Sequence, residues 1–194
     1  MPDLDDEIIV IDRDDLFKGD DFQGFRNLNE INYESRILNN KKVMKRQDAE
    51  NDEKFKQPIG YTVLYNPKNK SIFAYNRAKD PGNYRERRLG GKWSIGVGGH
   101  IIPKDTEFSN FIKESVYRKV LDDEVESIED QKSTGKIKEI NLLGYINDDS
   151  DNVGKFHFGI LCLVYINGHP VAKSKAIPYG DLYGLDKIER ICST

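Results

Sequence analysis

Short apolar runs along the chain predict most of its strands. Runs rich in β-branched or aromatic residues fit the pleated, half-buried surface of a sheet, and they occur at residues 8–11, 59–65, 71–76, 93–99, 138–148 and 156–167. Residues 66–70, with Asn66 and Pro67, predict a hairpin turn between two of these strands. The run ILCLVYI at 160–166 is apolar enough for a central strand.

A different spacing distinguishes residues 106–125. Apolar side chains recur at three- and four-residue steps, which predicts an amphipathic helix: Phe108, Phe111, Ile112, Val116, Val120 and Leu121. Its buried stripe should consist of Phe111, Ile112, Val116, Val120 and Leu121. Thr106 or Ser109 is the expected N-cap. Residues 180–191 predict a short C-terminal helix. Strands with one helix in the middle and one at the end predict an α/β or α+β sandwich.

Two stretches are mainly polar. Residues 1–21 contain nine carboxylates around the apolar run 8–11, which predicts a strand with solvated acidic flanks. Residues 41–56 mix both charges with few apolar positions and predict a polar helix or loop. The composition of residues 77–91 predicts a long basic loop.

Composition excludes several classes of protein. The 194 residues carry 33 acidic and 30 basic side chains, so the net charge of −3 gives no broad nucleic-acid footprint. The longest apolar run is too short to cross a bilayer, and the N-terminus is acidic where a signal peptide is basic. Cys162 and Cys192 lack metal-ligand spacing. We expect a soluble, cytoplasmic protein with neither a membrane nor a nucleic acid as partner, and the sequence leaves a homo-oligomer open.

Candidate chemistry begins at a glycine pair and continues on the helix that follows. Gly98 and Gly99 end a predicted strand, and a glycine pair lets the backbone approach an ion or a phosphate, or simply forms a turn. Asp122 and Asp123 are adjacent on the helix, with Lys119 about one turn before them. Such carboxylates either bind a hard cation such as Mg²⁺ or form a solvated helix face.

Five segments in order resemble the Nudix hydrolase superfamily, and in particular a branch of predicted phosphoesterases. They are FQGF (22–25), KQPIGY (56–61), GVGGHI (96–101), RKVLDDEV (118–125) and VGKFHFG (153–159). The resemblance covers most of the chain. It implies a Nudix-type α/β/α sandwich with a central mixed sheet, formed by a single domain over residues 1–194. Residues 56–194 would be its core, and residues 1–55 an N-terminal extension packed on or flanking that core.

The resemblance also implies an activity, which is metal-dependent hydrolysis of a phosphoanhydride or phosphoester bond in a small nucleotide-like molecule. In this superfamily, helix glutamates bind Mg²⁺ or Mn²⁺ together with a backbone carbonyl of the glycine pair, and an arginine ties the helix to the preceding loop. Asp122 and Asp123 match the metal-binding and catalytic glutamates, Arg118 matches the arginine, and Gly98 would offer the carbonyl.

Lys119 is the main departure from the superfamily pattern, because it stands where the resemblance implies a glutamate. Either its ammonium replaces a cation beside the two aspartates, or it points into solvent. In the first case the chain is a catalytically degenerate module that binds a nucleotide or a protein partner. The spacing from Gly99 to Arg118 is also five residues longer than in the general motif. A register without this insertion would place Asp105 in the first acidic position.

The remaining candidates belong to substrate binding. Arg88, Gly99, His100 and His157 are the predicted substrate-binding residues, and for the two histidines a structural role is the alternative. Asp148 and Asp149 either add a metal ligand or a base, or are turn residues. A third interpretation is a nucleic-acid-binding accessory protein that uses the basic loop at 85–92.

Overall fold

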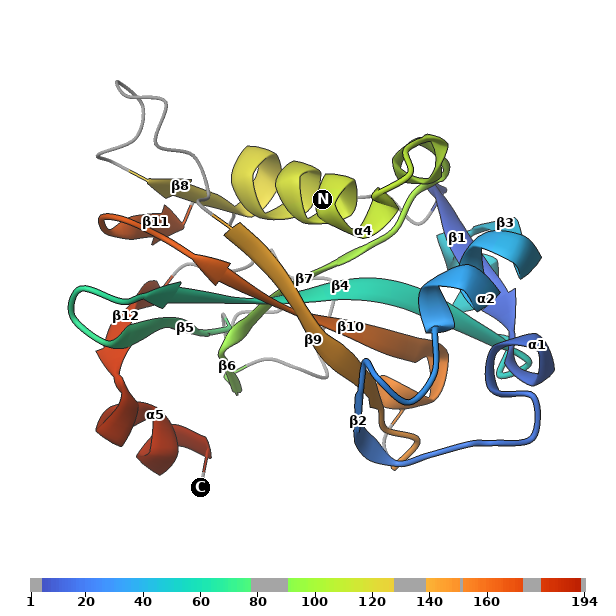
Figure 1. Ribbon diagram of the computed structural model, residues 1–194, viewed down its shortest axis with the longest axis horizontal. Coiled ribbons are helices and arrows are strands. Elements are labelled where there is room, and N and C mark those ends of the chain that lie inside the picture. Colours follow the sequence, from blue (N-terminus) through green and yellow to red (C-terminus); the bar gives the residue numbers. More distant parts are fainter. Residues whose placement is uncertain (1–4, 78–90, 128–138, 151, 173–178, 193–194) are drawn as a thin grey trace. The chain divides into compact units, whose positions relative to one another are not determined.

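A computed structural model describes residues 5–77, 91–127, 139–150, 152–172 and 179–192, with residues 121–127, 171–172, 179 and 192 described by their backbone only (Figure 1). The chain forms two compact units, each assembled from three separate stretches of sequence. Unit 1 comprises Met1–Tyr61, Gly98–Val116 and Leu142–Cys162, and unit 2 comprises Thr62–Val97, Tyr117–Asn141 and Leu163–Thr194.

The sheet of unit 1 takes its strands from distant parts of the sequence. Strands β4 (Phe55–Asn66), β10 (His157–Tyr165), β9 (Glu139–Asn147) and β2 (Gly24–Asn27) are neighbours in that order, and the unit 1 residues of β4, β9 and β10 form this part of the sheet. Strand β1 (Glu7–Asp12) pairs antiparallel with β4 and with β3 (Lys41–Lys45), and β7 (Gly96–His100) also pairs with β4. Strand β1 is buried throughout Ile8–Ile11, which explains its continuous apolar run.

Short helices follow these strands in unit 1. They are α1 (Arg13–Phe17), α2 (Tyr33–Asn40), α3 (Arg46–Ala49) and α4 (Phe111–Val116), with 3-10 turns at Pro103–Glu107 and Gly154–Phe156. The carboxylate of Asp12 starts α1 by accepting a hydrogen bond of 3.0 Å from the amide of Asp14, so this acidic residue is a cap as well as a flank of β1. Asn32 caps α2 in the same way, 2.9 Å from the amide of Ser35.

An aromatic cluster fills the space between the first two helices and strands β9 and β10. The ring of Tyr33 on α2 lies 4.8 Å from that of Tyr145 on β9 and 5.1 Å from that of Phe158 on β10. Phe17 and Phe22 complete the cluster with edge-on contacts to Phe158. Aromatic pairs at these distances add to the stability given by their burial, so this end of unit 1 is a well-packed frame.

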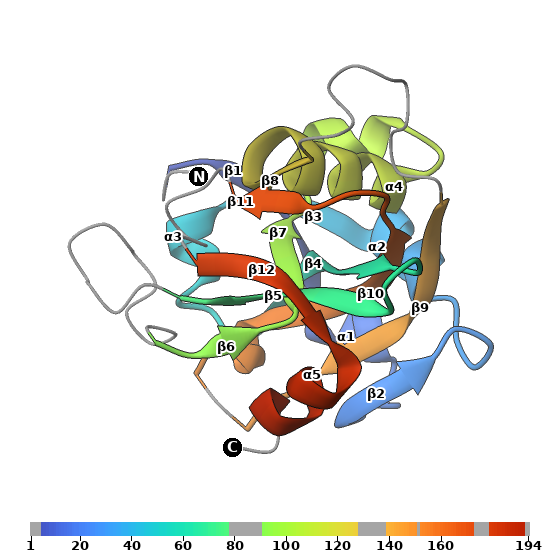
Figure 2. The same ribbon diagram turned by 90° about the vertical axis from the view of Figure 1, so that its left-hand side faces the viewer.

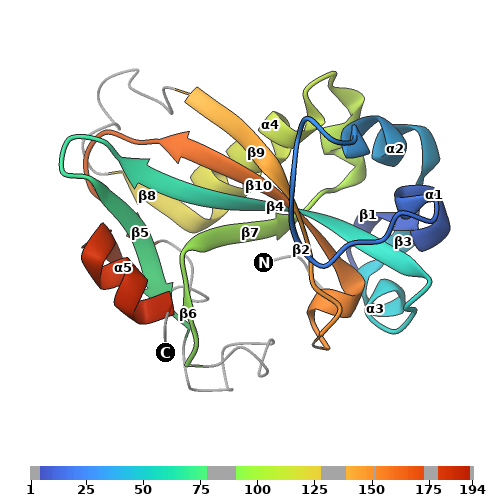
Figure 3. The same ribbon diagram turned by 60° about the horizontal axis from the view of Figure 1, so that its bottom comes forward.

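Unit 2 contains a second set of strands. Strand β5 (Ser71–Asn76) lies between β12 (Tyr179–Gly184) and the unit 2 part of β4 (Figure 2). Strand β6 (Trp93–Ser94) also pairs with β5. A separate pair is formed by β8 (Val125–Ser127) and β11 (Pro170–Ala172). Helix α5 (Leu185–Cys192) packs beside β5 and β12 (Figure 3). The pairing of Tyr65 with Ile72 confirms the predicted hairpin. Gly180 is needed because a Cβ there would lie 2.2 Å from the ring of Phe73.

The long predicted helix differs from the observed segment at its start. Residues 106–125 contain the end of a 3-10 turn, then α4 from Phe111, then a π-helical stretch Tyr117–Glu124. The carbonyl of Asn110 accepts the first helical bond, 3.1 Å from the amide of Glu114, so the prediction of Thr106 or Ser109 as N-cap was wrong. Asp105 explains the delay, because its carboxylate accepts a bond of 3.0 Å from the amide of Ile102 and closes the preceding turn.

The buried stripe of this segment is confirmed where its side chains are described. Phe111, Ile112, Val116 and Val120 are buried, and the side chain of Leu121 lies outside the description. Phe108 precedes α4 and is 49% exposed, so it is not part of the stripe. Two further expectations need correction. Residues 41–56 begin with strand β3 and helix α3, and the first half of the predicted C-terminal helix is strand β12. Among the described residues, no helix has both the length and the apolar character required to cross a membrane.

Candidate functional site

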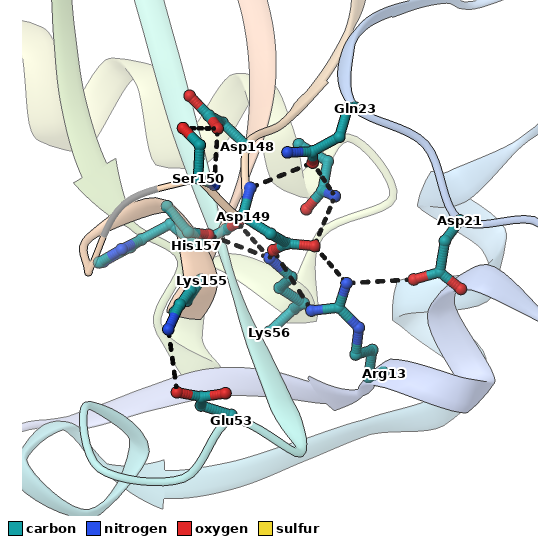
Figure 4. Close-up of polar contacts among 12 residues, drawn as sticks. Arg13, Asp21, Gln23, Glu53, Lys56, Asp148, Asp149, Ser150, Lys155 and His157 are labelled. Atoms are coloured by element: carbon teal, nitrogen blue, oxygen red, sulfur yellow. Dashed lines mark hydrogen bonds and ion pairs between the residues drawn. The ribbon is translucent and has the colours of Figure 1, made fainter.

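One end of the unit 1 sheet brings together residues from four strand ends. Strand β1 pairs with the start of β4 in a register that sets Ile11 opposite Lys56, and the amide of Arg13 donates to the carbonyl of Lys54 at 2.8 Å. Strand β2 pairs with the end of β9, which places Gln23 beside the turn between β9 and β10. The polar side chains at these ends therefore converge on the turn that contains Asp149 (Figure 4).

Lys56 is the centre of this cluster. Its side chain is fully buried, and its ammonium donates to Asp149 Oδ1 at 2.6 Å, to the carbonyl of Gly154 at 3.0 Å and to the carbonyl of His157 at 3.3 Å (Figure 4). An ammonium has three N–H donors, so these three acceptors satisfy it. A buried charge is tolerated only when it is paired and hydrogen-bonded in this way.

Asp149 supplies the negative charge. It accepts a hydrogen bond of 3.3 Å from Arg13 Nη1 and a closer one from Nη2, while Arg13 also contacts Asp21 at 3.1 Å. Burial alone would raise the pKa of Asp149, but the bonds from Arg13 and Lys56 outweigh burial and lower that pKa to about 2. Burial lowers the pKa of Lys56, and its bond to Asp149 opposes that shift.

The turn after β9 therefore has a structural explanation. Asp149 is paired with both Lys56 and Arg13, and these bonds lower its pKa, so it serves as their counter-ion. Its neighbour Asp148 accepts bonds from the amide of Ser150 at 2.9 Å and from its hydroxyl at 2.6 Å. Both aspartates thus match the interpretation as turn residues.

Two predicted substrate-binding residues meet beside this cluster. His100 ends β7, His157 begins β10, and their Nε2 atoms lie 3.3 Å apart although 57 positions separate them in the sequence. The rings are tilted by 50° with their centroids 5.4 Å apart. Gln57, next to Lys56 on β4, places its Oε1 atom 2.8 Å from Nε2 of His100.

The partners of this pair define where its protons lie. His157 Nδ1 is 2.6 Å from the carbonyl of Val153, and because a carbonyl only accepts, Nδ1 carries a proton. In a neutral ring the Nε2 atom of His157 is then an acceptor, and the single Nε2–H of His100 is shared between the Oε1 atom of Gln57, which is closer, and this nitrogen.

The backbone near His100 is held on two sides. The amide of Ile9 on β1 donates to the carbonyl of Ile101 at 2.8 Å, and the amide of Ile101 donates to the carbonyl of Pro58 on β4 at 3.3 Å. His100 is also buried. Its imidazole therefore projects from a fixed backbone, as a binding or catalytic group requires.

The other predicted site residues are placed less completely. Gly98 and Gly99 belong to β7 and are half-buried, and Arg118 lies in the π-helical segment Tyr117–Glu124. Asp122 and Asp123 follow Arg118 in that segment, where the description is confined to the backbone. Arg88 lies outside the described residues, as does most of the predicted basic loop at 77–91.

The fit of the chain to a divalent ion depends on the two aspartates and on Lys119. Within the described residues no three or more His, Cys, Asp or Glu side chains are grouped as a metal site, and the side chains of Asp122 and Asp123 are not among those described. Adjacent carboxylates are hard oxygen donors, so their chemistry fits Mg²⁺ or Mn²⁺. Lys119 in the same segment is only 5% exposed, which excludes the view that it points into solvent. The two aspartates therefore suit a divalent ion. Lys119 adds a buried positive charge at a position where the resemblance implies a glutamate.

Sequence reasoning missed the residues that organise the cluster. Lys56 and Gln57 precede the apolar run of β4, and the sequence singled them out only as part of the segment KQPIGY that resembles the superfamily. Arg13 gave no local signal, because it approaches Asp149 only through the pairing of β1 with β4.

Comparison with known proteins identifies the relatives of the chain. No family model matches it. It is 37% identical over 167 residues to Protein YmaB of Bacillus subtilis (strain 168), which covers 83% of the chain and 76% of that relative. The chain belongs to the same family as YmaB.

Solved structures identify the fold of this family member. Tm1382, a candidate Nudix hydrolase, matches 97% of the chain and 91% of its own length at 24% identity and a TM-score of 0.74. The chain thus has the Nudix fold, and the predicted α/β architecture with a mixed sheet is confirmed. The Nudix domain of Shewanella oneidensis NrtR matches 70% of the chain and 77% of its own length at 13% identity, with a TM-score of 0.49 that is too low to bear on function.

Proposed function

We propose that the chain hydrolyses a phosphoanhydride or phosphoester bond in a small nucleotide-like molecule, with Mg²⁺ or Mn²⁺ held by Asp122 and Asp123. The observation that carries the proposal is the Nudix fold together with this carboxylate pair on the helical segment after β7. The resemblance also assigns a ligand role to the carbonyl of Gly98. A bound divalent ion would polarise the phosphoryl group and activate water.

The chain's own residues would bind and orient the substrate. The guanidinium group of Arg88 suits phosphoryl oxygens, because a planar fork of N–H donors matches two oxygens at once. Arg118 would tie the acid-bearing helical segment to the preceding loop. The backbone of Gly99 allows close approach of a phosphate. His100 and His157, whose Nε2 atoms lie 3.3 Å apart, would contribute to substrate binding.

The test uses the full chain and a panel of nucleoside diphosphate derivatives, with phosphate release measured with and without Mg²⁺ or Mn²⁺. Turnover should require the ion, and Asp122→Asn or Asp123→Asn should reduce kcat/KM by about 100-fold or more. Asp48→Asn, at an exposed position of α3, is the matched control and should leave turnover unchanged. Ion-independent turnover, or full activity in Asp122→Asn, would contradict the proposal.

A catalytically degenerate module that binds a nucleotide or a protein partner is the second candidate. The burial of Lys119 favours it, because an ammonium in the acid-bearing segment competes with a divalent ion. Calorimetric titration with Mn²⁺ separates the two candidates. Binding that is lost in Asp122→Asn supports the hydrolase, whereas nucleotide binding without Mn²⁺ binding supports the degenerate module.

A further inference from the structure

Two consecutive residues of β4 hold the histidine pair from different directions. Side chains of neighbouring residues in a strand point to opposite faces, and here the ammonium of Lys56 binds the backbone at His157 while the amide of Gln57 contacts the ring of His100. We infer that Lys56 and Gln57 are positioning residues, which fix the separation of the two imidazoles and the nitrogen that carries each proton. Their effect on catalysis rests on the proposed function, but their effect on the imidazoles does not.

Lys56 acts through the turn before β10. Two of its acceptors are the carbonyls of Gly154 and His157, which lie at either end of the 3-10 turn Gly154–Phe156. Val153 immediately precedes this turn, and its carbonyl orients the ring of His157 through the 2.6 Å bond from Nδ1. The ammonium therefore closes the backbone segment that selects the Nδ1–H form of His157.

Gln57 acts on the other imidazole. Its Oε1 atom faces Nε2 of His100 and requires that nitrogen to carry a proton. If the amide were reversed, its N–H would face His100, and His157 would have to donate from Nε2 while its Nδ1 proton remains bound to Val153. That arrangement requires a charged His157, so the observed orientation is the one that suits a neutral pair.

A stabilising role and a positioning role make different predictions for a double variant. Replacing both members of a buried ion pair by apolar residues is often neutral for stability, because no charge is left unpaired. Lys56→Met combined with Asp149→Leu should therefore fold, while the carbonyls of Gly154 and His157 lose their shared donor. A role in stability alone would leave the imidazoles of this variant unchanged.

The experiment is ¹⁵N NMR of histidine-labelled full-length protein, which distinguishes protonated from unprotonated ring nitrogens. Wild type should show His157 protonated at Nδ1 and His100 protonated at Nε2. The double variant should show a mixture of the two forms at His157, and in hydrolysis assays kcat should fall about tenfold with KM unchanged. Lys155→Met is the matched control, since Lys155 follows Gly154 but forms only an exposed pair with Glu53 at 3.6 Å (Figure 4), and it should preserve both signals.

Gln57 provides an independent arm of the same experiment. Gln57→Met removes the acceptor and should abolish the preference for Nε2–H at His100, whereas Gln57→Glu retains an acceptor oxygen and should restore it. Wild-type imidazole spectra in both the Lys56→Met/Asp149→Leu double variant and Gln57→Met would overturn the inference. Absence of hydrolysis by wild type would instead count against the proposed function and leave the NMR result as the test of positioning.

Discussion

Two buried lysines, one in each unit, differ in how much of the surroundings of their positive charge is described. Lys56 in unit 1 has a complete set of acceptors, which includes a carboxylate with a lowered pKa. Lys119 in unit 2 is nearly as buried, but its place on the helix is where the resemblance implies a metal-binding acid. Lys119 was recognised as unusual from its position in a motif. The partners that neutralise Lys56 became visible only in the tertiary structure.

Breaking the unit 1 pair from one side gives the largest expected effect. Asp149→Leu leaves the ammonium of Lys56 buried without its anion and should lower the free energy of unfolding by about 3–5 kcal/mol. Urea denaturation measures the change. Combining it with Lys56→Met should restore most of the loss, and Lys155→Met should cost less than about 0.5 kcal/mol. A loss below about 1 kcal/mol in Asp149→Leu would show that solvent reaches Lys56.

The next effect probes the packing beside Lys119. Val120 is 1% exposed, so Val120→Asp would bury a carboxylate and should destabilise the protein by about 3 kcal/mol. Val120→Ala is the control for lost volume, and its smaller loss should leave a difference due to the charge. Thermal unfolding of both variants gives the comparison. Equal melting temperatures for Val120→Asp and wild type would mean that Val120 faces solvent.

The contrast between the two lysines also shows how far the sequence predicts the structure. The strands at 8–11, 71–76 and 138–148 were predicted because their apolar pattern is local. The start of α4 was not, because Asp105 closes a turn that the helical period does not reveal. Helices α1 and α2 were missed, since residues 13–40 are polar enough to hide their few buried side chains.

In the candidate site, too, the features with a local sequence signal were predicted and the tertiary contacts were not. His100 and His157 were predicted from the residues around them, and the structure shows that they contact one another. The cluster of Arg13, Lys56 and Asp149 depends on the pairing of β1 with β4 and on a turn far along the chain. Register between distant strands is not encoded in any local spacing, so these partners could not be predicted.

Low pH should weaken the ion pair between Lys56 and Asp149 less than the substitution of Asp149 does. The pKa of Asp149 is lowered to about 2 by Arg13 and Lys56, so the stability it provides is complete above its ordinary pKa and is lost as the pH falls through 2. After allowance for solvent screening, we expect a loss of about 1 kcal/mol between pH 4 and pH 2. Urea denaturation across this window should show a smaller loss in the Lys56→Met/Asp149→Leu variant. Equal losses in the two proteins would contradict this assignment.

The smallest expected effect sharpens the contrast at Lys119. Lys119→Glu replaces an ammonium by a carboxylate near Asp122 and Asp123, and the metal-free protein should lose about 0.2–0.5 kcal/mol for each new like-charge pair. Affinity for Mn²⁺ should rise, because hard-cation sites strengthen with the number of charged oxygen ligands. Calorimetry on wild type and variant measures both affinities. Equal values would exclude Lys119 as the residue that weakens the metal site.

The assembly of unit 1 from separate stretches has a consequence for the newly made protein. Lys56 and its counter-ion Asp149 are 93 positions apart, so at typical rates of synthesis the ribosome adds Asp149 about 5–20 s after Lys56. During that interval the ammonium stays hydrated, and the start of β4 has neither β9 nor β10 beside it. Unit 1 can therefore close only after residues 142–162 have left the exit tunnel, and until then an apolar strand edge is exposed to chaperones and to neighbouring nascent chains.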